Sequence, residues 1–117
     1  MAEPDPLKAK NVWVATVRPD GRPHLAPVWF VVADGKWYLC TAPESVKARN
    51  LQSNPKITLA LEDGSSPYIV EGEARPVKPS AEVVRLFQEK YEWNIETDST
   101  YTQTYEVVVR KRVMAGG

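Results

Sequence analysis

The sequence has little sulfur, little imidazole and no net charge. The 117 residues include one cysteine and one histidine, and 15 basic side chains balance 15 acidic ones. A lone Cys40 excludes a disulfide framework within the chain, and with His24 as its one imidazole the chain cannot supply a typical zinc site. The neutral total argues against a protein that binds nucleic acid or an anionic membrane over its whole surface. We therefore expect the chemistry to come from a bound ligand and no metal site.

Long hydrophobic runs are also missing. No apolar run approaches the roughly 18 residues that a membrane-spanning helix needs, and the first ten residues lack the apolar stretch of a signal peptide. We expect a cytoplasmic protein without a membrane partner. The length predicts one domain over residues 1–117 with an N-terminal arm over 1–10, and the 43% of apolar residues predict a folded core.

The charges are distributed unevenly along the chain. Residues 8–56 hold eight basic and three acidic side chains, a surplus of +5, and the acid that balances them lies elsewhere. An anionic small ligand would be attracted to this half of the protein. The alternative is that these charges are scattered over solvated faces.

Prolines and glycines are frequent, ten and six respectively, which favours strands and tight turns over a helical bundle. Pro19-Asp20-Gly21 and Asp34-Gly35 predict hairpins, so the first three strands are expected to form a meander. Pro27 cannot donate a ladder hydrogen bond and predicts an edge or a bulge. Alternation of apolar residues predicts six strands, over 11–18, 22–33, 36–41, 56–62, 68–78 and 104–114.

Two segments have helical spacing instead. The first, 43–53, ends at Asn54-Pro55, and the second, 80–94, begins at Ser80 as its N-cap. A polar loop over 96–103 follows. Six strands of this length fit a small, partly closed antiparallel barrel. The four tryptophans are hard to bury in one such barrel, which favours dimerisation; the alternative is that some of them lie half exposed.

Four passages carry a family resemblance, over residues 14–24, 27–30, 41–51 and 54–59. In this order and spacing they resemble the pyridoxamine 5'-phosphate oxidase-like split β-barrel proteins, which bind FMN or the deazaflavin coenzyme F-420. The resemblance implies a mainly β, six-stranded antiparallel split barrel with two short helices. It also implies a homodimer that holds one cofactor per subunit at the interface.

The third passage predicts a phosphate site from its residues alone. A strand ends at Thr41, and the helix that follows brings backbone N–H groups, the Ser45 hydroxyl and the Lys47 ammonium together. By resemblance, Lys47 matches the phosphate-binding lysine of the family. Val46 stands where the oxidase has an arginine, and Arg49 or Arg22 is expected to compensate. A capped, solvated helix is the alternative.

The second passage is where the family lays the flavin ring against a strand. A proline suits such a strand because the ring replaces a neighbouring strand, although Val28 fits a barrel core equally well. Pro67 stands where the oxidase has a glutamine near the flavin. The expected cofactor-binding residues are Ala26, Pro27, Val28, Trp29, Thr41, Ser45, Lys47, Arg49 and Asn50.

The resemblance implies a flavin-dependent oxidoreductase, with FMN or the deazaflavin, that passes hydride or electrons to a small unsaturated or quinone-like substrate. The cofactor would supply the chemistry. The one candidate proton donor is His24, with a structural role as its alternative, and Cys40 is expected in the core. Arg110, Lys111 and Arg112 either reach a partner's cofactor or form a solvated edge. Other readings are a flavin carrier or sensor without turnover, and a haem-binding split barrel with His24 or a tyrosine as axial ligand.

Overall fold

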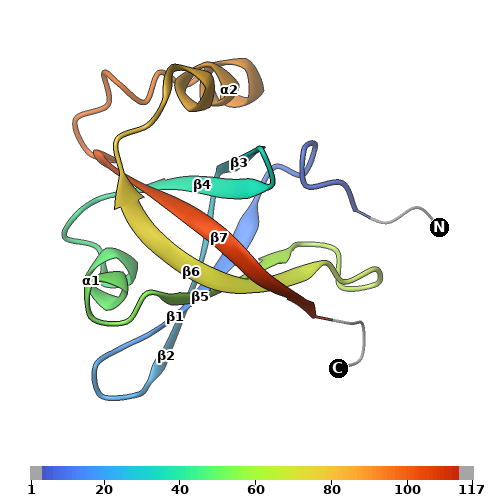
Figure 1. The fold of residues 1–117 in the computed structure, drawn as a ribbon, viewed down its shortest axis with the longest axis vertical. Coiled ribbons are helices and arrows are strands. Elements are labelled where there is room, and N and C mark those ends of the chain that lie inside the picture. Colours follow the sequence, from blue (N-terminus) through green and yellow to red (C-terminus); the bar gives the residue numbers. More distant parts are fainter. Residues whose placement is uncertain (1–3, 114–117) are drawn as a thin grey trace.

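The computed structural model describes residues 4–113, which form one curled antiparallel sheet with two helices (Figure 1). The strand order is β2-β1-β5-β6-β7-β4-β3. Residues 1–3 of the expected arm and the expected strand end at Met114 lie outside the described residues. The elements are β1 (Val12–Val17), β2 (Pro23–Val28), β3 (Phe30–Ala33), β4 (Lys36–Thr41), α1 (Val46–Ser53), β5 (Lys56–Leu61), β6 (Ile69–Val77), α2 (Ala81–Tyr91) and β7 (Gln103–Val113).

The prediction of a mainly β fold with two helices is confirmed, but the count of six strands is wrong. The segment expected as one strand over 22–33 is two strands, β2 and β3, separated at Trp29. β2 pairs with β1 and β3 pairs with β4, so the two halves form opposite edges of the sheet. The expected meander is therefore wrong as well: the chain crosses from one edge to the other at Trp29.

Side chains of α2 hold the crossing in place. The Phe30 N–H donates to the Tyr91 hydroxyl at 3.0 Å, and that hydroxyl lies 2.8 Å from the Phe30 carbonyl oxygen. The Lys90 ammonium donates to the same carbonyl at 3.0 Å and lies 4.0 Å from the centre of the Phe30 ring. The Phe30 backbone groups at the crossing therefore form hydrogen bonds with side chains of α2, a helix far away in the sequence.

Lys90 gives the crossing a pH dependence. Burial lowers the pKa of Lys90 from 10.5 to about 8, although the negative charge of Asp5 acts in the opposite direction and raises it. Between these values the unfolded chain binds more protons than the folded one, so the contribution of Lys90 to stability rises as the pH rises. We expect the melting temperature of the native protein, relative to that of Lys90→Met, to increase between pH 8 and pH 10 in paired thermal melts. A constant difference would contradict this.

Both predicted hairpins are confirmed. Gly21 has φ of 92° in the β1–β2 turn, and Asp34 and Gly35 have φ of 51° and 75° in the β3–β4 turn. In the β3–β4 turn, positive φ at both Asp34 and Gly35 is the backbone that joins two strands through a two-residue loop.

The helices cover different parts of the sheet. Figure 1 shows α2 outside β3 and β4, where Val83 and Phe87 pack on Val31 and Cys40. α1 starts at Val46 rather than at 43, after Ser45 as N-cap, and it buries Ala48 and Leu51 against the core inside the sheet. α2 ends at Tyr91 rather than near 94. Neither of these helices is long and apolar enough to span a membrane.

Gly72 marks a close approach between strands. It lies at the register shift between β6 and β7, and a Cβ atom there would collide with the backbone carbonyl of Val108. We expect Gly72→Ala to lower the free energy of unfolding by about 1–3 kcal/mol, because the obstacle is backbone that cannot rotate away. Urea denaturation measures the change, and Gly64→Ala, where the added Cβ meets nothing within 4 Å, is the control.

Candidate functional site

A pocket of about 440 Å³ lies beside the crossing, and we call it the split pocket. It receives residues from β2, from β4, from α1 and from the chain after α2. Four residues of the predicted site come together here: Pro27, Val28, Trp29 and Lys47. The full lining is Asn11, Pro27, Val28, Trp29, Cys40, Lys47, Trp93, Asp98 and Tyr101.

One wall of the split pocket is the free edge of β2. Arg18 N donates to Arg22 O, and counting along the register from that pair places Pro27 opposite Trp13 at a position without ladder hydrogen bonds. The Pro27 carbonyl therefore points away from β1, toward the free edge. Val28 packs against the core and also lines the split pocket, so its position is compatible with both expected roles, barrel core and cofactor contact.

Lys47 supplies the positive charge of the split pocket. It is half-buried, burial lowers its pKa, and within residues 4–113 its side chain forms no ion pair. A partly desolvated cation without a partner gains more from a bound anion than a fully hydrated one does.

Other predicted residues of the α1 turn have structural contacts. The Ser45 hydroxyl accepts from Ala48 N at 3.2 Å as the helix cap, and the Asn50 amide donates to Thr16 Oγ1 at 3.0 Å. Thr41 is fully buried, with its hydroxyl 3.5 Å from the Gln103 carbonyl. Ala26, Thr41 and Ser45 are not among the residues that line the split pocket.

Arg49 and Asn50 line a different pocket. This pocket, of about 370 Å³, lies between the β1–β2 turn and α1, and we call it the hairpin pocket. Its lining is Arg18, Pro19, Asp20, Arg22, Val46, Arg49 and Asn50. The structure thus divides the predicted site, with Lys47 in one pocket and both arginines expected to compensate for Val46 in the other.

His24 lies on β2 and lines neither the split pocket nor the hairpin pocket. Burial, together with the positive charges of Arg18 and Lys47, lowers the pKa of His24, so the imidazole is neutral at neutral pH. Its Nδ1 atom is buried and has no hydrogen-bond partner among residues 4–113.

The segment between α2 and β7 forms a wall that the sequence did not reveal. The Trp93 indole donates to Asp98 Oδ2 at 3.0 Å, and the N–H groups of Thr100 and Tyr101 each donate to Asp98 Oδ1 at 2.8 Å. The backbone donors, followed by the indole, lower the pKa of Asp98. The Trp93 ring stands at 73° to Trp29 and at 88° to Tyr101. An aspartate followed by small polar residues is a turn signal that would have predicted an ordered loop here.

Two of the three basic residues predicted on β7 contact side chains outside the split pocket. Arg110 pairs with Glu73 at 3.0 Å, and the Arg112 guanidinium lies 3.9 Å from the centre of the Tyr68 ring.

A curled antiparallel sheet with a pocket at the split between two consecutive strands defines a split-barrel fold. The sequence model of the pyridoxamine 5'-phosphate oxidase family matches residues 6–114. The chain belongs to this family, which confirms the resemblance read from its motifs.

Solved structures agree on the fold. HutZ, the haem storage protein of Vibrio cholerae, is 18% identical over 89% of this chain and 84% of its own, with a TM-score of 0.75. The conserved hypothetical protein Rv2991 of Mycobacterium tuberculosis is 28% identical over 89% and 75%, with a TM-score of 0.71. A putative pyridoxamine 5'-phosphate oxidase of Listeria innocua is 16% identical over 92% and 90%, with a TM-score of 0.72. No curated protein sequence matches the chain.

Proposed function

We propose that the protein is a flavin-dependent oxidoreductase with FMN in the split pocket, or the deazaflavin coenzyme F-420 in the same place. The observation that carries this proposal is the combination, in one pocket, of a free strand edge and a half-buried lysine that forms no ion pair within residues 4–113. The volume of about 440 Å³ is in the range of roughly 300–1,000 Å³ that holds cofactors. A small unsaturated or quinone-like compound is the proposed substrate.

The residues present fit such a cofactor. When bound, the flavin supplies the hydride or electron transfer. Lys47 would hold the phosphate as a point charge, and the Pro27 carbonyl at the free edge of β2 would be available as a hydrogen-bond acceptor for the ring. Trp29, Trp93 and Tyr101 exclude water from the ring.

No side chain of the split pocket acts as a nucleophile in this proposal. Burial raises the pKa of Cys40 to about 11, so Cys40 stays a thiol at neutral pH. His24 is neutral and can hold one proton near the pocket.

We further propose a cytoplasmic homodimer built on the outer face of β1 and β2. Trp13, Val17 and Leu25 are 38%, 37% and 61% exposed. Trp13 lies opposite Pro27, and Ala15 opposite Leu25, so the apolar side chains share one face of the sheet. Because Pro27 belongs to this face and also lines the split pocket, a second copy seated here would border the cofactor.

Haem is the second candidate ligand, favoured by one observation. Tyr101 lines the split pocket and is 45% exposed, so its hydroxyl is available as an axial ligand. The single imidazole, His24, does not line that pocket.

Titration with FMN, coenzyme F-420 and haemin, followed by absorption and fluorescence, tests the proposal. We expect one FMN or one deazaflavin per subunit, with a perturbed flavin spectrum. A Soret band with haemin that Tyr101→Phe abolishes, and no response to either flavin, would replace flavin with haem. A bound flavin that no nicotinamide donor reduces would favour a carrier or sensor.

A further inference from the structure

We propose that the hairpin pocket is a second anion-binding site, separate from the Lys47 end of the split pocket, that binds a multivalent anion such as a diphosphate or a polycarboxylate. Three arginines line it, Arg18 and Arg22 from the β1–β2 turn and Arg49 from α1. The one acidic residue in its lining is Asp20. The lining therefore carries a surplus of two positive charges.

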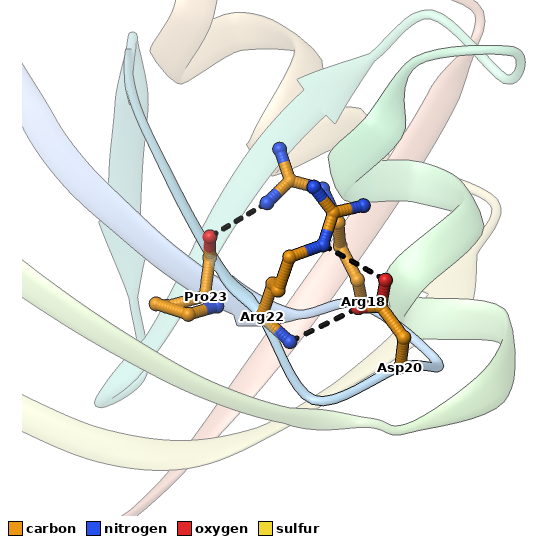
Figure 2. Close-up of polar contacts among 4 residues, drawn as sticks. All are labelled: Arg18, Asp20, Arg22 and Pro23. Carbon is orange, nitrogen blue, oxygen red and sulfur yellow. Dashed lines mark hydrogen bonds and ion pairs between the residues drawn. The ribbon is translucent and has the colours of Figure 1, made fainter.

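Two of the guanidinium groups are fixed by the turn itself. Arg18 Nη1 donates to the Pro23 carbonyl at 2.8 Å, and Arg22 Nε donates to Asp20 Oδ2 at 2.8 Å. Asp20 Oδ1 also accepts from the Arg22 backbone N–H at 3.1 Å, which holds the carboxylate in place. Figure 2 shows both arginine side chains extending from the turn in the same direction. Each contact uses one of five guanidinium donors, so most donors are left for a ligand.

The positive charge of the hairpin pocket is not neutralised within the fold. Among residues 4–113, Arg18 and Arg49 form no ion pair, and the Arg22–Asp20 pair is the one that this pocket contains. The first turn of α1, where Val46 borders the pocket, has no acidic residue. Like charges held close to one another repel, and a bound anion removes that repulsion.

Arginine favours anions with several oxygens. A guanidinium binds two oxygens of a phosphate or carboxylate at once, and three of them around one pocket match a group with more oxygens than a single phosphate offers. The Lys47 ammonium belongs to the split pocket, and the two pockets share no lining residue. The second site is therefore separate from the pocket that we propose for the flavin ring.

Pyrophosphate binding tests the site directly. At low salt, isothermal titration of the native protein with pyrophosphate is expected to give a 1:1 isotherm that Arg22→Gln/Arg49→Gln weakens by at least about tenfold, the equivalent of about 1.4 kcal/mol. Arg85→Gln is the matched control because Arg85 is an exposed arginine on α2 that pairs with Glu89 at 3.0 Å and lines neither pocket. Circular dichroism checks that the variants fold.

Each outcome bears on the proposal. No heat with the native protein, or equal affinity in the double variant and Arg85→Gln, would overturn it. Loss of pyrophosphate binding in Lys47→Ala, or displacement of pyrophosphate by FMN, would place the anion in the split pocket and overturn it as well. Unchanged binding in the presence of FMN supports a separate site. If coenzyme F-420 displaces pyrophosphate but FMN does not, the hairpin pocket binds the tail of that coenzyme. If neither cofactor displaces pyrophosphate, the hairpin pocket binds a separate, free anion.

Discussion

Lys47→Ala is expected to weaken FMN binding about 10- to 100-fold, because a charge-assisted hydrogen bond contributes about 1.5–3 kcal/mol. Lys47 is the one basic side chain among the residues that line the split pocket. Arg49 follows Lys47 by two residues on α1 but lines the hairpin pocket instead, so it cannot take over this role. Quenching of FMN fluorescence on binding gives the dissociation constant.

The control for Lys47→Ala is Lys56→Ala. Lys56 is an exposed lysine at the start of β5 and lines neither the split pocket nor the hairpin pocket. Lys47→Arg keeps the charge and is expected to recover part of the affinity. Full affinity in Lys47→Ala would remove the phosphate role of Lys47 from the proposal, while leaving the anion site of the hairpin pocket untouched.

Local signals predicted most of the elements. The Ser80 cap, the Asn54 stop and the Asp34-Gly35 turn act within a few residues, and each is found where the sequence placed it. The alternation over 56–62 likewise gives β5 to within one residue. Such features are encoded by neighbouring side chains, so the sequence is sufficient to read them.

The break at Trp29 could not be read in this way. The hydrogen bonds of Phe30 come from Tyr91 and Lys90, about half the chain length away. Pro27 correctly indicated a sheet edge, but a proline alone does not specify that the partner strand changes at Trp29. The division of the basic residues between two pockets has a local cause instead. Lys47 and Arg49 are two positions apart on α1, so they point in different directions around the helix axis.

Leu25→Glu is expected to convert a dimer into a monomer and to reduce FMN affinity with it. Leu25 is 61% exposed on the apolar outer face of β1 and β2, and a carboxylate buried there by a second copy would cost several kcal/mol. Leu7→Glu is the matched control, since Leu7 is 65% exposed but lies before β1. Light scattering after size exclusion gives the mass. A native protein that is monomeric at micromolar concentration, or a Leu25→Glu variant that stays dimeric, would contradict an interface on this face. A monomeric variant that keeps full FMN affinity would show that the split pocket is complete within one subunit.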